Sequence, residues 1–220
     1  MKILCIIPAY NAALYIAATI RSIQKQTYKN VEIVVIDDKS TDNTFEVAKS
    51  CGVTVIKNLE NTGCYLALNV VLNSYHDFDA WYYHCADDIS FENHFAELVA
   101  PLISDNLLMM TYCNYNRKDF YTGKLLGEFT GRRASMCLYR AEVFDRIGPY
   151  DSTRFGGDTE YWDRFLIYYR QNQIHHVNQC LANCMMHGQN LTIIHNGNAR
   201  REYVEQFKAR HSQLQASLNF

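Results

Sequence analysis

Residues 3–11 read Ile3-Leu4-Cys5-Ile6-Ile7-Pro8-Ala9-Tyr10-Asn11, an apolar run that stops abruptly in a turn. Short apolar runs closed by turn residues are typical of buried strands. We expect Asn11 to cap a helix, because apolar side chains then recur at helical spacing, at Leu14, Ile16, Ala17, Ile20 and Ile23. This stretch therefore predicts a buried strand followed by an amphipathic helix.

The same unit repeats along the amino-terminal part of the chain. Further apolar runs follow at Val31–Ile36, Val53–Ile56 and Trp81–Tyr83, and a helical stretch with Leu66, Asn69, Val70 and Leu72 precedes the last of them. Strands that alternate with helices predict a parallel sheet with right-handed crossovers. We therefore expect an α/β fold whose ligands bind at the carboxyl ends of the strands.

Acidic pairs stand where these strands end. Asp37-Asp38 follows the second apolar run, and Asp87-Asp88 comes just after Trp81–Tyr83. Adjacent buried carboxylates are costly because each raises the pKa of the other. A hard divalent cation, held together with the phosphates of a ligand, relieves that cost. The alternative for Asp87-Asp88 is an exposed turn that caps a helix starting near Phe91.

Composition excludes several classes of partner. The chain has 220 residues, a formal net charge of −2, 48% hydrophobic and 20% charged residues, which suits a single globular domain. No basic run or face points to nucleic acid or to anionic lipid. The apolar run at Ile3–Ile7 is interrupted by Pro8 and Asn11, so it is too short for a secretory core or a membrane span.

Eight cysteines are scattered along the chain without a C-x-x-C pair. That spacing gives no support to a zinc ribbon or a thioredoxin-type centre. We expect free, mostly buried thiols and a cytoplasmic location.

Six segments, in order, resemble the family 2 glycosyltransferases, which have the GT-A fold, invert configuration and use nucleotide sugars. The segments are Ile7–Asn11, Val35–Thr44, Asn61–Gly63 with Asn69, Ala86–Asp88, Ile147–Asp151 and Gly157–Arg164. The resemblance covers roughly residues 3 to 190. It implies a three-layer α/β/α sandwich with a mostly parallel central sheet.

The resemblance also assigns the donor-binding residues. Asp38 corresponds to a carboxylate that hydrogen-bonds the pyrimidine ring, and Asp37 lies beside it. Pro8, Ala9 and Tyr10 would line the same pocket. The alternative role of Tyr10 is core packing. Asp42 is expected to be the N-cap of the helix that starts near Thr44.

Asp88 is expected to bind Mn²⁺ or Mg²⁺, and Asp87 to contact the ribose, the donor sugar or the metal through water. Many family members carry an aspartate where this chain has Cys85, and a soft thiol is a poor Mg²⁺ ligand. His187, in a late His-Gly-x-Asn segment, is a further candidate ligand that would favour Mn²⁺.

Asp158 is the expected general base, which would take the proton from the acceptor hydroxyl. It stands after Gly156-Gly157, at the start of a predicted helix, and the alternative is that it only caps that helix. Glu160 is the second candidate for the base.

The predicted function is metal-assisted transfer of a sugar from a nucleotide-diphosphate sugar, with UDP as the expected nucleotide, to a hydroxyl acceptor such as a growing glycan. We expect one domain with a nucleotide-binding half at 1–90, an acceptor-binding half at 91–197 and a C-terminal helix at 198–220. A stretch from Asn114 to Arg133 is expected to form an irregular hairpin or loop. A nucleotidyltransferase, an inactive nucleotide-sugar binding module and further domains of a larger enzyme remain open.

Overall fold

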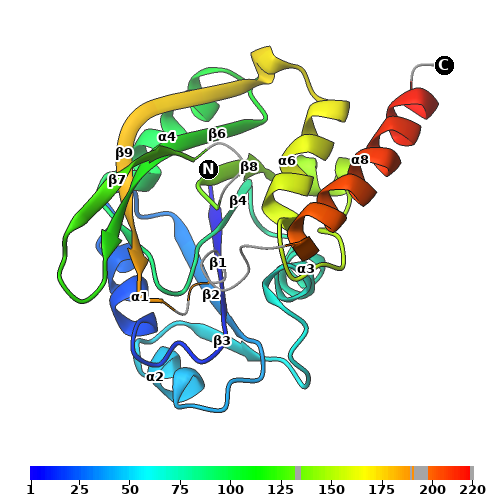
Figure 1. The fold of residues 1–220 in the computed structure, drawn as a ribbon. Coiled ribbons are helices and arrows are strands. Elements are labelled where there is room, and N and C mark those ends of the chain that lie inside the picture. Colours follow the sequence, from blue (N-terminus) through cyan, green and yellow to red (C-terminus); the bar gives the residue numbers. More distant parts are fainter. Residues whose placement is uncertain (132–134, 189, 191–197, 219–220) are drawn as a thin grey trace.

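The computed structural model describes residues 1–131, 135–188, 190 and 198–218. Its first half alternates strands and helices as the sequence predicts (Figure 1). The strands are β1 (Ile3–Ala9), β2 (Val31–Asp37), β3 (Thr54–Lys57) and β4 (Ala80–Tyr83), and the helices are α1 (Ile16–Gln24), α2 (Thr44–Ser50) and α3 (Cys64–Ser74). β1 pairs in parallel with both β2 and β4, and β2 pairs in parallel with β3. The four expected strands are thus confirmed.

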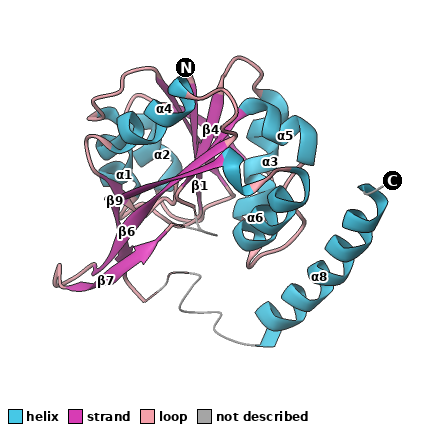
Figure 2. Ribbon diagram, turned by 90° about the horizontal axis from the view of Figure 1, so that it is seen from above, coloured by secondary structure: helices cyan, strands magenta, loops and turns pink. Residues whose placement is uncertain are grey.

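Alternate residues of β1 enter two separate cores. Ile3, Cys5 and Ile7 pack with α1 and α4, whereas Leu4 and Ile6 pack with α3 and α6 on the opposite face. All five side chains are at most 1% exposed. A strand buried on both faces needs a continuous apolar run, which explains why β1 shows no polar alternation. The expected arrangement of helices on both faces of the sheet is confirmed (Figure 2).

The predicted N-cap at Asn11 is wrong. α1 begins at Ile16 with Tyr15 in the cap position. Asn11 instead adopts a left-handed backbone (φ 50°), and its side-chain oxygen accepts a hydrogen bond from the backbone N–H of Thr41 at 2.8 Å. Asparagine tolerates this conformation better than most residues, and its amide joins the loops that follow β1 and β2. An asparagine that follows a strand can either cap a helix or join two loops, and the sequence pattern does not distinguish these two roles.

The second half extends the same sheet. Its elements are β5 (Ile89–Ser90), α4 (His94–Ser104), β6 (Met110–Asp119), β7 (Leu125–Thr130), β8 (Cys137–Arg140), α5 (Ala141–Ile147), α6 (Gly157–Tyr168), a 3₁₀ turn (Gln171–Gln173) and β9 (Ile174–Met186). Among the described residues, the strand order is β3-β2-β1-β4-β8-β6-β9-β5, with β7 paired to β6. The antiparallel β6–β7 pair, with an irregular register at Arg117/Lys118, confirms the expected hairpin.

α8 (Asn198–Leu218) follows the outer side of α6 (Figure 1). Its Phe207 is 1% exposed, and its Arg210 pairs with Asp151, in the loop before α6. Within the described ranges, none of the helices has the length and apolar character that a membrane crossing needs.

Candidate active site

The loops after β1 and β2 meet at the carboxyl edge of the sheet. The Asp38 backbone N–H donates to the carbonyl of Ala9 at 2.8 Å, which places Pro8, Ala9 and Tyr10 beside Asp37-Asp38. Tyr10 is 51% exposed, so its ring is free to meet a ligand rather than packed in the core. The structure therefore brings together the residues that the sequence assigned to the nucleotide pocket.

Asp38 has a structural task that the sequence analysis missed. Its Oδ1 accepts hydrogen bonds from the Asn58 side chain at 2.9 Å and from the backbone and hydroxyl of Thr62 at 3.0 and 3.1 Å. Its Oδ2 accepts one from the backbone N–H of Gly63 at 2.7 Å. The residue is 2% exposed. Asp38 thus holds the turn that leads into α3.

Asp37 is fully buried next to this turn. Its Oδ1 accepts a hydrogen bond from the Ser40 backbone at 3.3 Å, whereas its Oδ2 meets no donor within the described part of the chain. An unpaired buried carboxylate oxygen is costly, and active sites are where such atoms occur.

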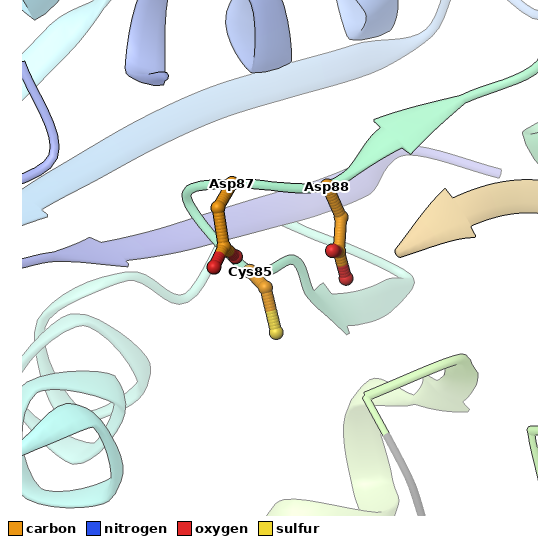
Figure 3. A group of neighbouring side chains, drawn as sticks. All are labelled: Cys85, Asp87 and Asp88. Carbon is orange, nitrogen blue, oxygen red and sulfur yellow. The ribbon is translucent and has the colours of Figure 1, made fainter. Parts of the chain in front are cut away.

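A candidate cation site lies in the segment between β4 and β5. The ligand atoms of Cys85, Asp87 and Asp88 all lie within 4.8 Å of one another. Figure 3 shows the three side chains pointing to the same side of the segment that carries them. Thr19 of α1 donates to the carbonyl of Ala86 at 2.8 Å and so fixes this segment against the sheet.

Asp88 is 4% exposed. Its Oδ2 accepts a hydrogen bond from the Cys184 thiol at 3.2 Å, and its Oδ1 accepts one from the backbone N–H of Met185 at 3.2 Å. Burial, and secondly the charge of Asp87, raises the pKa of Asp88 well above its usual range. These contacts exclude the alternative of an exposed capping turn. A bound cation would stabilise the ionised form of this carboxylate.

His187 reaches the site through Asp87. Its Nε2 lies 2.9 Å from Asp87 Oδ2, which also accepts a hydrogen bond from the Asn190 side chain at 2.8 Å. The imidazole stacks on the ring of Tyr15, with centroids 4.3 Å apart. His187 and Asn190 therefore orient one carboxylate of the cluster, and the described ligand group contains Cys85 rather than His187.

Asp158 is the second residue of α6. Gly156 before it has a left-handed backbone (φ 72°), and a Cβ on Gly157 would come within 2.7 Å of the Tyr65 ring. These two glycines let the chain turn against α3 and present Asp158 beside it. Burial raises the pKa of the Cys64 thiol to about 12, and the Asp158 carboxylate contributes to that rise.

Glu160, the second candidate for the base, is 3% exposed and fully engaged. Arg164 donates to its two oxygens at 2.8 and 3.0 Å, and His211 of α8 lies 3.0 Å from Oε1. These contacts make Glu160 a packing residue between α6 and α8.

Two further contacts connect the halves of the chain, and sequence reasoning gave them no role. Arg154 donates to the side chain and the carbonyl of Asn61 at 2.8 and 2.9 Å. Asn69 of α3 exchanges two hydrogen bonds of 2.8 Å with the backbone of Tyr150. Asn69 stood in a family-like segment, which was the one available signal for it.

Comparison with known proteins identifies the family of this chain. The family model described as glycosyl transferase family 2 matches residues 4–162. An uncharacterised glycosyltransferase of Rickettsia typhi is 30% identical over 184 residues, which are 73% of this chain and 57% of that protein. The Escherichia coli protein named UDP-Glc:alpha-D-GlcNAc-diphosphoundecaprenol beta-1,3-glucosyltransferase WfaP is 35% identical over 124 residues, 52% of this chain and 47% of that protein.

Among solved structures, the chain is similar to glucosyl-3-phosphoglycerate synthase of Mycobacterium tuberculosis in complex with Mn²⁺, UDP and glucosyl-3-phosphoglycerate. The TM-score is 0.74 at 17% identity, over 96% of this chain and 80% of that one. The fold is thus that of the GT-A glycosyltransferases. The chain belongs to glycosyl transferase family 2. It spans less than two thirds of the length of the curated relatives it matches.

Proposed function

We propose that this domain transfers a sugar from a UDP-sugar to a hydroxyl acceptor, with inversion at the anomeric carbon and with Mn²⁺ or Mg²⁺ bound. The observation that carries the proposal is that Asp37-Asp38 and Asp87-Asp88 follow β2 and β4, the two strands that flank β1 in parallel, at the carboxyl edge of one sheet. Tyr83 links Asp87-Asp88 to the start of α6, which carries Asp158. The Cys85 thiol lies 3.7 Å from the Tyr83 hydroxyl, and the Tyr83 ring lies edge-on to Tyr65, with centroids 6.4 Å apart, where Gly157 before Asp158 packs on the Tyr65 ring.

The donor would bind with its base against Tyr10 and the turn that Asp38 holds, and with Asp37 next to it. UDP is favoured because the name of the E. coli relative includes a UDP-sugar and the mycobacterial structure contains UDP. The division into a nucleotide-binding half (1–90), an acceptor-binding half (91–197) and a C-terminal helix (198–220) is part of this proposal.

Asp88 and Asp87 fit a divalent cation, because they offer carboxylate oxygens at one place and Asp88 is buried beside a like charge. When bound, the cation would neutralise negative charge on the departing nucleoside diphosphate. His187 and Asn190 would keep Asp87 in the required orientation, since both contact its Oδ2. His187 remains a candidate ligand if its ring turns from Asp87 to the cation.

Asp158 would act as the general base. It lies in the first turn of α6, where the helix dipole stabilises a negatively charged carboxylate. It would take the proton of the acceptor hydroxyl while that oxygen attacks the anomeric carbon and the bond to the diphosphate breaks. One displacement of this kind inverts the configuration.

A panel of UDP-, GDP- and dTDP-sugars, assayed for nucleoside diphosphate release with and without Mn²⁺, tests the proposal. Release of UDP, dependent on the metal, is expected. Release of pyrophosphate would indicate a nucleotidyltransferase, and thermal stabilisation by nucleotide without any turnover would indicate a binding module. NMR of the product would show the anomeric configuration, and retention would contradict the single displacement.

A further inference from the structure

Two thiols lie against the carboxylates of the proposed cation site. Cys85 belongs to the ligand group with Asp87 and Asp88, and its Sγ lies 3.3 Å from the Ser135 hydroxyl. Cys184, on β9, donates its thiol to Asp88 Oδ2 at 3.2 Å. The thiols approach from different parts of the chain, because Cys85 follows β4 and Cys184 is 96 residues away from Asp88 in sequence.

This donor set differs from one built for a hard cation. Mg²⁺ takes oxygen ligands in near-octahedral geometry, whereas thiolate sulfur selects softer cations such as Zn²⁺. Zn²⁺ binds sulfur at about 2.3 Å and carboxylate oxygen at about 2.0–2.2 Å, in a tetrahedron that catalytic sites leave open at one position. Ligand atoms that lie within 4.8 Å of one another can close around such an ion by small side-chain movements.

We propose that Cys85, Asp87 and Asp88 form a thiophilic cation site that prefers Zn²⁺ to Mn²⁺ and Mg²⁺, with Cys184 beside it. This inference rests on the proposed function in one respect, because both place a cation at the carboxylates of Asp87 and Asp88. On binding, the Cys85 thiol loses its proton to solvent and its sulfur coordinates the ion. The three protein ligands leave the fourth position for a phosphate oxygen of the donor. Zn²⁺ would therefore compete with Mn²⁺ at this site.

Binding of Cd²⁺ alone, without donor, tests the proposal. Cd²⁺ stands in for Zn²⁺ because its bond to a thiolate gives an ultraviolet charge-transfer band. The reduced, chelator-treated full chain is titrated with Cd²⁺ under argon, and Zn²⁺ and Mn²⁺ affinities are compared by calorimetry. We expect a saturable band and a Zn²⁺ dissociation constant below that of Mn²⁺. The Zn²⁺ dissociation constant should rise at least about 10-fold in Cys85→Ser, since loss of even an outer-shell partner weakens metal binding by about 10–100-fold.

Three variants test whether the Cys85 thiolate gives the ultraviolet band. Cys85→Ser should remove it, and Cys85→Asp should remove it while tightening Mn²⁺ binding relative to Zn²⁺. Cys180→Ser is the matched control. Cys180, like Cys85, is half-buried, but its thiol donates a hydrogen bond to Asn116 and not to the carboxylates of the cation site. It should keep the band. Far-ultraviolet circular dichroism and melting curves verify that each variant is folded.

A native chain that gives no band, a Cys85→Ser chain that keeps it in full, or Mn²⁺ binding as tight as Zn²⁺ binding would each overturn the proposal. These outcomes are separate from failure of the proposed function. Metal-dependent UDP release together with the absence of a thiolate band would leave the transferase standing and remove only the thiophilic site.

Discussion

Asp38 offers the sharpest test of the site, because its carboxylate serves the fold and, as we propose, also the nucleotide. Four hydrogen bonds converge on it from Asn58, Thr62 and Gly63. Replacing Asp38 with alanine leaves the backbone N–H groups of Thr62 and Gly63 without an acceptor. An unsatisfied donor costs about 1–3 kcal/mol, and both donors are half-buried, so we expect Asp38→Ala to lower the unfolding free energy by about 2–4 kcal/mol.

Asp38→Asn refines the test. Asparagine keeps one acceptor oxygen for Thr62, but its amide N–H₂ must then face the Gly63 N–H, so two donors oppose each other. We expect a loss of about 1–3 kcal/mol for this one broken contact. Asp42→Ala is the matched control. Asn43, not Asp42, holds the cap position of α2, so the expected cap at Asp42 is wrong. Asp42 accepts a hydrogen bond from the Thr44 backbone, and loss of one such bond costs about 0.5–1.5 kcal/mol.

Urea denaturation measures the three unfolding free energies, and calorimetry on the folded variants measures UDP affinity. The reasoning predicts that both Asp38 variants lose stability and that UDP affinity falls with it, because the turn beside the nucleotide is no longer fixed. An Asp38→Ala protein as stable as the native chain would refute the anchoring role. If that protein had also lost UDP affinity, Asp38 would be a direct ligand of the base and nothing more.

Three further outcomes follow from the site and the core. Asp158→Asn should fold and bind UDP almost normally but lose a factor of about 10²–10⁴ in transfer rate, the scale for a positioned base, and loss of UDP affinity instead would make Asp158 a binding residue. Because the pKa of Asp88 is raised on folding, its contribution to stability is full only below its unfolded pKa and is lost as the pH rises. Asp88→Asn should therefore melt higher than the native metal-free chain at pH 8 and show no Mn²⁺-dependent thermal shift, and a lower melting temperature would contradict this. Burial lowers the pKa of His94 to about 3, so the unfolded chain takes up the proton first as the pH falls below about 6.5. His94 should cost about 3 kcal/mol of stability between pH 7 and pH 4, and a His94→Phe chain with an equally steep pH dependence would refute that origin.

Local sequence carried much of the fold. The strands β1, β2, β3 and β4 were predicted because each is an apolar run ended by polar residues. A strand of a sheet that is covered on both faces has apolar residues at consecutive positions, and this pattern is visible in the sequence. The prediction for Asn11 failed because the residue lacks a local partner. Its side-chain oxygen accepts a hydrogen bond from the backbone N–H of Thr41, in the loop after β2, and the spacing of residues in the sequence does not indicate this contact.

The contacts of each candidate site residue could not be read from the sequence. Asp87 and Asp88 look equivalent in the sequence, yet one is held by His187 and Asn190 and the other by Cys184 and the Met185 backbone. Glu160, two residues from Asp158, lies on another side of α6 and pairs with Arg164 and His211. A helix turns about 100° per residue, so neighbours in sequence meet different surroundings.

The sequence by itself determined the α/β class, the family and the set of acidic residues at the strand ends. These features depend on local residue patterns and on short segments in a fixed order, both of which can be seen in the amino-acid sequence. The tertiary structure alone decided that Asp38 anchors a turn, that Glu160 is a packing residue and that Cys184 lies against Asp88. The physical reason is that hydrogen bonds and burial depend on partners brought together from distant parts of the chain, and it is those partners that set what each side chain can do.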